Sequence, residues 1–404
     1  MAIVHPFKGW LPKAEKAAEI SSVPYDVVNA KEAAELAQGK RESFLHVIRP
    51  EIDLPGGTAF HADEVYEKGA ENLKKLLASE SMQQDDVPSL YVYQLETDSR
   101  TQTGVFACAS VQDYDNDVIL KHELTRPDKE DDRTRHIITQ MAHAEPVMLT
   151  FKDTDGGITF LMEKTMLTSE PAIDINPDGT VRHRIWKIQA PAELVEAFSK
   201  IPTLYVADGH HRCKSASRAA EELRKKDGTP PGEAEYDYFP AVLFPIDQMN
   251  ILAYNRIIKK VNEETFRRLR EDFDLTEQAE PVPEEKGTVS IYYKGSWYGL
   301  RLPESEKEKT ASQLDVARLQ NHILSPLFGI ENPRTDENID FVGGIRGTVE
   351  LERLVDEGEA DLAISMYPTA IEELVKVSDE GDLMPPKSTW FEPKIRSGLI
   401  IHTF

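Results

Sequence analysis

The sequence has very little cysteine and no long apolar run. Its 404 residues include two cysteines, Cys108 and Cys213, which lie far apart along the chain. Two distant thiols exclude a disulfide framework and do not provide the spacing of a zinc site. Neither the first residues nor any later stretch resembles a signal peptide or a membrane-spanning helix. We therefore expect a cytoplasmic protein that has no membrane partner.

Positive charge is also scarce. The chain has 47 Lys and Arg against 71 Asp and Glu, so its formal net charge is −24. A general nucleic-acid binder needs a basic face, and this balance argues against one. The apolar fraction of 40% and charged fraction of 29% are typical of a globular protein. A chain of this length exceeds one compact core, so two or three domains or subdomains are expected.

One stretch combines a strand, a tight turn and a helix. Leu204 to Ala207 is a short apolar run, Asp208-Gly209 interrupts it, and Cys213 to Arg224 has helical composition. The N-terminus of a helix presents unpaired N–H groups and a positive dipole, and both favour an anion. The expected phosphate ligands at this turn are Gly209, His210, His211 and Arg212.

A second polar block follows a short strand predicted at Val118 to Lys121. Four cations occur within thirteen positions of this acidic chain: Lys121, Arg126, Lys129 and Arg133. Such a local reversal of charge is typical of an anion site. The alternative is a salt-bridged helix face, because three carboxylates at 130–132 lie among the cations.

Polar groups near the two ends of the chain are further candidates. Asp26 and Arg49 are expected at the ends of local elements, with a strand predicted at Phe44 to Ile48. In the alternative interpretation, Asp26 caps a helix and Arg49 pairs with Glu51. Near the C-terminus, a proline-rich loop carries side chains suited to phosphate oxygens, which are Lys387, Ser388, Thr389 and Lys394. The alternative there is an ordered structural loop.

The remaining pattern predicts a mixed succession of strands and helices. Ile158 to Glu163 is predicted as a strand, and Arg182 to Ile188 as an edge strand. The hydrophobic pattern also predicts a hairpin that joins strands at 89–96 and 103–114. A Pro/Glu-rich stretch at 277–287 is the expected connector between residues 1–276 and residues 288–404.

The residues at 207–212, Ala-Asp-Gly-His-His-Arg, resemble the signature of the ParB/sulfiredoxin-like superfamily, whose Gly-X-X-Arg turn holds nucleotide phosphates. The Asp-Gly-His-His-Arg form is similar to that of the free L-serine kinases in this superfamily. From the Val-Pro-Tyr-Asp-Val block at 23–27 to the Met-Pro-Pro-Lys-Ser-Thr block at 384–389, the chain resembles a large prokaryotic family catalogued as a domain of unknown function. The resemblance implies an α/β (α+β) fold with a ParB/sulfiredoxin-like core, an insertion at about 85–190 and a C-terminal α/β region that contributes to the site.

The resemblance also implies roles for individual residues. The candidates for the catalytic base are Asp208, Asp26 and Glu123. The implied donor-binding residues are Gly209, His210, His211, Arg212, Lys121, Arg126, Lys387, Ser388 and Thr389. The implied substrate-binding residues are Arg49, His122 and Thr125. Asp208 is preferred as the base, and the alternative is that it caps the following helix.

The expected reaction is phosphoryl transfer from ATP, ADP or pyrophosphate to the hydroxyl of free L-serine or a similar small metabolite. Such chemistry usually requires Mg²⁺ to bridge the donor oxygens. A nucleotide-binding regulator without turnover is one alternative, and a phosphoserine phosphatase or another phosphotransferase is the other. The sequence leaves open which side chains would hold a metal and what the oligomeric state is.

Overall fold

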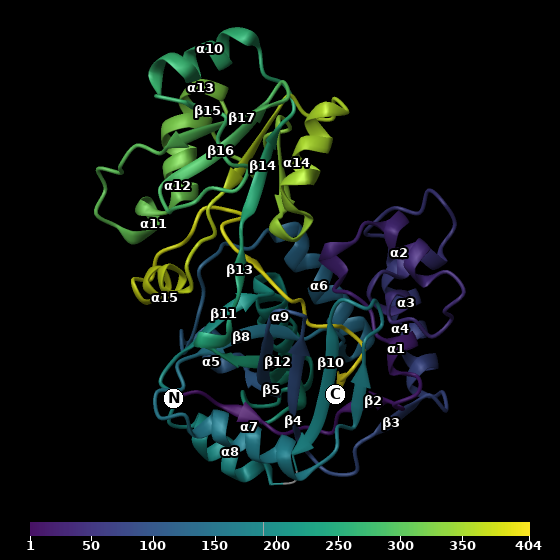
Figure 1. The fold of residues 1–404 in the computed structure, drawn as a ribbon. Coiled ribbons are helices and arrows are strands. Elements are labelled where there is room, and N and C mark those ends of the chain that lie inside the picture. Colours follow the sequence, from purple (N-terminus) through teal and green to yellow (C-terminus); the bar gives the residue numbers. More distant parts are fainter. Residues whose placement is uncertain (189) are drawn as a thin grey trace. The chain divides into compact units, whose positions relative to one another are not determined.

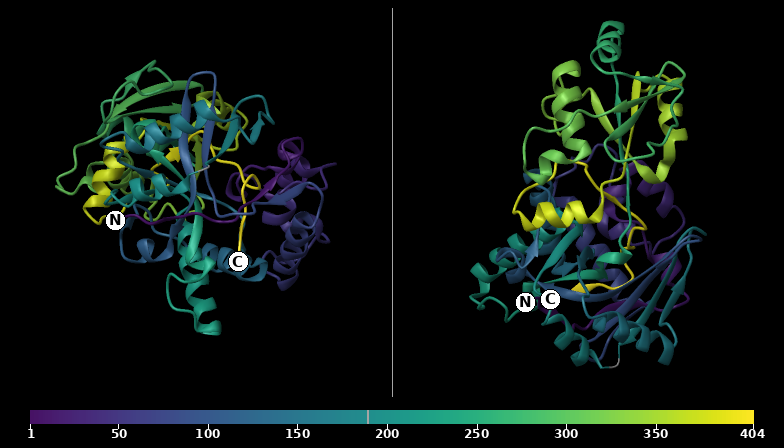
Figure 2. Two further views of the ribbon diagram at one scale, coloured as in Figure 1. Left: turned by 90° about the horizontal axis from the view of Figure 1, so that it is seen from below. Right: turned by 60° about the vertical axis from the view of Figure 1, so that its left-hand side comes forward.

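The computed structural model describes residues 1–188 and 190–404, which divide into two compact units (Figure 1). The first unit contains Met1–Lys121, Thr125–Met249 and Pro393–Phe404, and the second contains His122–Leu124 and Asn250–Glu392. The second unit thus begins ahead of the predicted 277–287 connector, which lies inside it. Figure 2 shows the last residues of the chain, in yellow, ending within the first unit.

A nine-stranded mixed sheet forms the centre of the first unit, in the order β6-β11-β8-β12-β5-β4-β10-β9, with β1 paired to β5. Its strands are β1 (Val4–His5), β4 (Leu90–Glu96), β5 (Thr101–Ser110), β6 (Ile119–Leu120), β8 (Val147–Phe151), β9 (Ile173–Ile175), β10 (Arg182–Ile188), β11 (Leu204–Asp208) and β12 (Tyr238–Pro245). β11 runs parallel to β6 and antiparallel to β8. The predicted hairpin is present as β4 and β5, but residues 111–114, predicted as part of the second strand, are helical. β10 was expected at an edge but pairs with both β4 and β9, because residues 173–175 supply a further strand.

Helices surround this sheet. They are α1 (Ala17–Ile20), α2 (Ala30–Ala37), α3 (Leu45–Ile48), α4 (Asp63–Leu77), α5 (Val111–Asp115), α6 (Pro127–Gln140), α7 (Gly157–Thr168), α8 (Pro191–Phe198) and α9 (His210–Asp227). Short 3₁₀ helices are η1 (Tyr25–Val27), η2 (Pro50–Asp53), η3 (Glu235–Asp237) and η4 (Ile246–Gln248). Two small ladders pair β2 (Trp10–Pro12) with β3 (Met82–Gln84) and β7 (Ala142–His143) with β21 (His402–Thr403).

Two of these helices replace predicted strands. Residues 45–48 form one helical turn, because the chain reverses here from α2 towards α4 and buries Leu45, Val47 and Ile48 together. Residues 157–168 form α7, because the Asp153 carboxylate accepts the N–H groups of Ile158, at 3.4 Å, and Thr159, at 2.8 Å, and so starts a helix. Ile158 and Met162 then point to the core four residues apart.

The second unit contains a six-stranded sheet in the order β15-β17-β16-β19-β14-β18, in which every pairing is antiparallel. Its strands are β14 (Tyr254–Ile258), β15 (Thr276–Glu277), β16 (Thr288–Tyr293), β17 (Ser296–Arg301), β18 (Ile339–Gly343) and β19 (Leu362–Met366), and a separate ladder pairs β13 (Ile251–Leu252) with β20 (Trp390–Phe391). The helices are α10 (Glu263–Asp272), α11 (Thr310–Gln313), α12 (Asp315–Leu319), α13 (Ser325–Phe328), α14 (Gly347–Asp356) and α15 (Ile371–Asp379), with a π-helical turn at Gln320–Leu324 and a 3₁₀ turn, η6, at Gly344–Arg346. The expected mixed α/β class is therefore confirmed.

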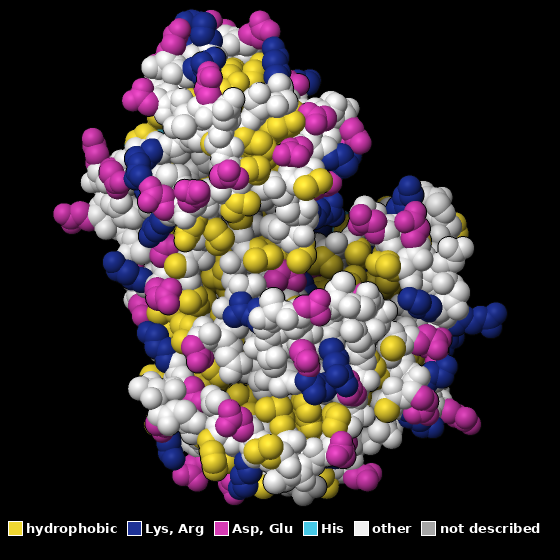
Figure 3. All heavy atoms as spheres, viewed as in Figure 1, with side chains coloured by type: hydrophobic (Ala, Val, Ile, Leu, Met, Phe, Trp, Pro, Cys, Tyr) yellow, Lys and Arg dark blue, Asp and Glu magenta, His cyan; other side chains and the backbone are white. Residues whose placement is uncertain are grey.

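Charged side chains of both signs are scattered over the face drawn in Figure 3, where Lys and Arg side chains are interspersed with Asp and Glu side chains and with hydrophobic ones. Among the helices that the structure describes, none is both long enough and apolar enough to cross a membrane.

Candidate anion-binding active site

The turn between β11 and α9 is the geometric centre of the candidate site. β11 ends at Asp208, and α9 begins at His210, three residues earlier than the sequence predicted. Gly209 makes the whole turn with a φ of 103°, which L side chains rarely adopt. A Cβ atom at this position would meet Arg212 Nε and Val147 Cγ1, each at 3.0 Å. His210, His211 and Arg212 therefore form the first turn of an 18-residue helix, where their N–H groups have no intrahelical acceptor.

Asp208 lies in a cluster of cations beside this turn. Its Oδ2 atom is 3.2 Å from Arg212 Nη2 and 3.6 Å from Lys394 Nζ. Burial on its own would raise the pKa of Asp208, but Lys394, Arg212 and His210 outweigh it and lower the pKa to about 2. Gly209 is the residue that caps α9, so the alternative role of Asp208 as a helix cap is wrong.

Arg212 is buried beneath the turn, with 6% of its side chain exposed. Nη1 donates to the Pro146 carbonyl, and Nη2 donates to Asp208. Although burial opposes it, the carboxylates of Asp26, Asp208 and Glu145 together raise the pKa of Arg212, so the guanidinium stays charged. These contacts hold Arg212 within the protein, which is the geometry of a residue that positions the turn.

Glu145 joins three segments below the same turn. Oε1 accepts the Tyr25 N–H at 3.1 Å and the Ser397 hydroxyl at 3.3 Å, while Oε2 is 3.5 Å from Arg133 Nη1. Burial raises the pKa of Glu145, and the nearby arginines, Arg212 and Arg133, oppose that effect. Glu145 thus ties the N-terminal block and the C-terminal segment to the first unit's central sheet.

The Tyr25–Asp26 block lies next to this buried cluster. Tyr25 is buried with Arg133 4.2 Å from its ring, whereas Asp26 is exposed. The carboxylate of Asp26 is close enough to favour the charged form of Arg212. Asp26 does not cap α2, because Asn29 does so in a reciprocal capping box with Glu32.

Arg49 contacts the same block from the other side. Its Nε atom is 2.9 Å from Glu51 Oε1, which confirms the predicted pair. Nη1 also donates to the Tyr25 carbonyl at 3.4 Å. Arg49 is therefore fixed beside the peptide that leads into Asp26.

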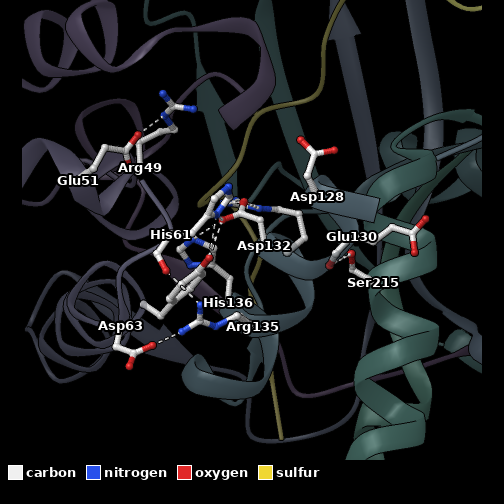
Figure 4. Close-up of polar contacts among 12 residues, drawn as sticks. Arg49, Glu51, His61, Asp63, Asp128, Glu130, Asp132, Arg135, His136 and Ser215 are labelled. Carbon is white, nitrogen blue, oxygen red and sulfur yellow. Dashed lines mark hydrogen bonds and ion pairs between the residues drawn. The ribbon is translucent and has the colours of Figure 1, made fainter. Parts of the chain in front are cut away.

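Two helix N-termini meet at the candidate site. The Arg126 N–H at the start of α6 donates to His211 Nε2 at 3.1 Å. One turn further along both helices, the Ser215 hydroxyl donates to the Glu130 carbonyl at 3.1 Å (Figure 4). Contacts that advance in the same direction along both helices show that α6 and α9 run parallel. Their positive dipole ends therefore reinforce one another.

The other predicted residues of this block contact nearby groups. Lys121 Nζ pairs with Asp117 at 2.8 Å, and Arg126 Nη2 pairs with Asp128 at 2.9 Å. The Thr125 hydroxyl donates to Glu130 at 2.5 Å. Lys121 and Arg126 thus form surface salt bridges with Asp117 and Asp128, and not with the carboxylates at 130–132 that the salt-bridge alternative named. Exposed pairs of this kind exchange partners at little cost.

A buried polar network occupies the next turns of α6 (Figure 4). Asp132 accepts the Tyr66 hydroxyl at 3.0 Å and Arg133 Nε at 2.8 Å, and His61 Nδ1 is 3.4 Å away. Burial raises the pKa of Asp132, but Arg133 and His136 outweigh burial and lower it. The pKa of His136 falls well below its usual value because of burial and Arg133. This network fixes Arg133, which in turn supports Tyr25 and Glu145.

The remaining predicted residues belong to the second unit. The His122 carbonyl accepts the Met384 N–H at 2.7 Å, so this segment, which includes Glu123, lies against the proline-rich loop. In that loop Ser388 is buried, Lys387 is exposed, and Thr389 lies between these extremes. Roles for His122, Glu123, Lys387, Ser388 and Thr389 remain predictions.

A comparison with models of known protein families identifies the family of this chain. A model of the family described as "Protein of unknown function (DUF1015)" matches residues 4–317. The chain belongs to the DUF1015 family. No curated protein matches the sequence.

Similar solved structures include a free serine kinase in complex with AMP, at 13% identity and a TM-score of 0.36, which covers 73% of this DUF1015 chain and 92% of the kinase. SbnI with a C-terminal truncation, from Staphylococcus aureus, is 13% identical with a TM-score of 0.38, covering 72% of this chain and 85% of SbnI. A conserved hypothetical protein from Pyrococcus furiosus is 14% identical with a TM-score of 0.34, covering 73% and 95%. The expected resemblance to free serine kinases is thus confirmed as a likeness, and likenesses at this level do not establish an activity.

Sequence reasoning missed Glu145 of this DUF1015 site and did not place Lys394 beside Asp208. Glu145 lies between Ala144 and Pro146, and no motif distinguishes it from the many other glutamates. Lys394 was one of four phosphate-suited side chains in the C-terminal loop, but its placement beside Asp208 depends on residues 393–404 returning to the first unit. No sequence signal marks either contact, because both join segments that are distant along the chain.

Proposed function

We propose that this DUF1015 protein is a phosphotransferase that binds a phosphorylated donor at the Gly209 turn and phosphorylates the hydroxyl of a small metabolite. The observation that carries this proposal is the pairing of two helix N-termini, those of α6 and α9, beside an exposed carboxylate, Asp26. Phosphoryl transfer depends on charge neutralisation and alignment more than on a covalent nucleophile. Free L-serine as acceptor, and ATP, ADP or pyrophosphate as donor, follow from the resemblance of residues 208–212 to the free serine kinases.

The backbone of the turn is the proposed donor ligand. The N–H groups of His210, His211 and Arg212 belong to the first turn of α9, and Gly209 adds no side chain at the turn that leads into it. Arg212 and Asp208 position this turn from below. Lys121 and Arg126 are proposed to leave their surface carboxylates and pair with the donor when it binds.

Asp26 is the proposed general base. An effective base has a pKa near the operating pH, whereas the pKa of Asp208 is lowered to about 2 by its cations. Asp26 is exposed and adjacent to Arg212, so an acceptor hydroxyl can approach both it and the turn. The acceptor proton passes to the Asp26 carboxylate as the acceptor oxygen bonds to phosphorus, and the donor's P–O bond to its leaving group breaks.

Magnesium fits this arrangement through hard oxygen ligands. Across residues 1–188 and 190–404, no three His, Cys, Asp or Glu side chains form a group that could hold a metal ion. Mg²⁺ in kinases is usually held by one or two carboxylates together with substrate phosphates, so the donor phosphates would supply the main oxygen ligands here while Asp26 stays free to act as the base. When bound, the ion would neutralise charge on the donor phosphates.

The test compares Asp26→Asn with Asp247→Asn. Both aspartates are exposed residues of 3₁₀ helices in the first unit, so the second variant is a matched control. As the base, Asp26 should contribute about 10²–10⁴ in turnover, while the control variant should keep the wild-type rate. If Asp26→Asn turns over at the wild-type rate, Asp26 is not the general base. Donor binding without turnover in the wild type would favour a regulator, and phosphate release from phosphoserine without a donor would favour a phosphatase.

A further inference from the structure

Arg256, in β14 of the second unit, is a buried cation whose guanidinium donates to carbonyl groups and lies 5.4 Å from the centre of the Phe341 ring. The residue is 3% exposed. Nη1 donates to the carbonyl of Tyr254, and Nη2 donates to the carbonyl of Lys387 at 3.0 Å. Its guanidinium thus links β14 to the proline-rich loop at 384–389.

Among the residues that the structure describes, no carboxylate balances the charge of Arg256, because no acidic side chain forms an ion pair with it within 4.0 Å. Other buried arginines differ: Arg318, also in the second unit and 5% exposed, is 3.3 Å from Asp315. A buried charge without a counter-charge is costly, and proteins normally pair such groups or use them to bind ligands.

The loop above Arg256 is strained and firmly held. Lys387 adopts a φ of 59°, in the left-handed region that long side chains avoid. Its neighbour Ser388 is fixed on both sides, because its hydroxyl donates to the Pro385 carbonyl at 2.6 Å and its carbonyl accepts the Thr369 hydroxyl at 2.8 Å. Strain maintained by surrounding contacts is a feature of ligand-binding loops.

Charge and exposure make the position suitable for an anion. Burial lowers the pKa of Arg256 to about 10, with Tyr254 opposing the effect, so the guanidinium remains charged at neutral pH. Lys387 is exposed, and its Nζ atom lies 5.2 Å from the centre of the Tyr254 ring. A second cation therefore lies at the surface of the loop whose backbone contacts Arg256.

We propose that the second unit binds a phosphate group between Arg256 and Lys387. The phosphate replaces the Lys387 carbonyl as acceptor for the Arg256 guanidinium, and this exchange lets Lys387 leave its left-handed conformation. A tetrahedral phosphate suits the site because its several oxygens accept from a guanidinium and an ammonium at the same time. This site belongs to the second unit and the Gly209 turn to the first, and the proposal does not depend on phosphoryl transfer at that turn.

Hydrogen exchange measured by mass spectrometry can localise the binding. The full chain is titrated with inorganic phosphate at constant ionic strength, with chloride as the balancing anion. We expect protection of the segments at 254–258 and 384–391, while protection at 208–213 reports the first-unit site independently. If phosphate protects the segments at 254–258 and 384–391 but not the segment at 208–213, the proposed donor site is contradicted and this inference stands.

Two variants and one control test the assignment. Arg256→Met should weaken phosphate binding at 384–391 by roughly tenfold or more, since a charge-assisted donor is lost. Arg318→Met is the control: it removes a buried, paired arginine from the same unit and should keep the protection. If Arg256→Met fails to fold, Lys387→Gly removes the ammonium and the strain at an exposed position, and should weaken binding at 384–391 in the same way. The proposal is overturned if phosphate protects 384–391 in Arg256→Met or in Lys387→Gly as strongly as in the wild type. It is also overturned if phosphate does not protect this segment in the wild type.

Discussion

Replacing Asp208 by Asn tests whether the cluster at the turn stabilises the fold. Asn keeps the size of the side chain but removes the charge that faces Lys394 and Arg212. The pKa of Asp208 is lowered from 3.8 to about 2 despite the opposing effect of burial, and each unit corresponds to about 1.4 kcal/mol, so the ionised carboxylate makes a net contribution of about 2–3 kcal/mol. The side chain is 23% exposed, so solvent screens this contribution only in part.

The direction of the pH dependence follows from the sign of the shift. The folded-state pKa lies below the unfolded value of 3.8, so the contribution is complete at neutral pH. It is lost as the pH falls from about 5 towards 2, because the unfolded chain takes up the proton first. Asp208→Asn should therefore be about 2–3 kcal/mol less stable than the wild type at pH 7, and the difference should shrink towards pH 2.

Urea denaturation followed by circular dichroism at several pH values measures this difference. Asp117→Asn is the control, because Asp117 pairs with Lys121 at the surface and is 69% exposed. It should change the free energy of unfolding by less than about 1 kcal/mol at any pH. If Asp208→Asn is as stable as the wild type at pH 7, the cluster does not stabilise the fold and the argument that Arg212 positions the turn is refuted.

Three further outcomes are expected. Gly209→Ala should lower stability by about 1–3 kcal/mol, because the φ of 103° and the contacts at 3.0 Å both oppose a Cβ atom; an unchanged melting temperature would contradict the described turn. Asn29→Ala should lower the stability measured by thermal unfolding by about 1 kcal/mol, because it removes the capping box of α2. Asn29→Asp should stay close to the wild type, and an equal loss of stability in both variants would contradict a capping role for this side chain. The net charge of −24 predicts no appreciable binding to duplex DNA in a fluorescence anisotropy titration at physiological salt, and salt-dependent binding below about 1 µM would contradict this.

The local hydrophobic pattern predicted many elements correctly but failed where a short apolar run could form either a strand or a helix. The short apolar run at Leu204 to Ala207 correctly indicates a strand, which extends to Asp208. Residues 45–48 and 158–163 are apolar runs of similar length, yet both are helical. The decisive contact for the second is the carboxylate of Asp153, several residues upstream, which caps the helix. A short apolar run that forms a strand has the same periodicity as one that forms part of a buried helix. Contacts with residues outside the run therefore decide between strand and helix.

The sequence predicted the kinds of residue at the site but not the residues that they contact. The turn at 208–212 was recognisable from the order of strand, Gly and basic residues. That Arg212 donates to Pro146 and Asp208, and so positions the turn, depends on how β11 packs against β8. The contacts of Glu145 with Tyr25 and Ser397 join segments that are close only after the whole first unit has folded.

Product formation is the most direct test of the proposed phosphotransferase activity. Purified full-length protein and Mg²⁺ are incubated with ATP, ADP or pyrophosphate and with L-serine, and phosphorus NMR follows each phosphorylated species. A series of other hydroxylated metabolites replaces L-serine in parallel samples. We expect a new phosphate monoester to appear with at least one donor and acceptor, and to disappear when Asp26→Asn replaces the wild type. If every donor remains intact with every acceptor, the proposed phosphoryl transfer is contradicted.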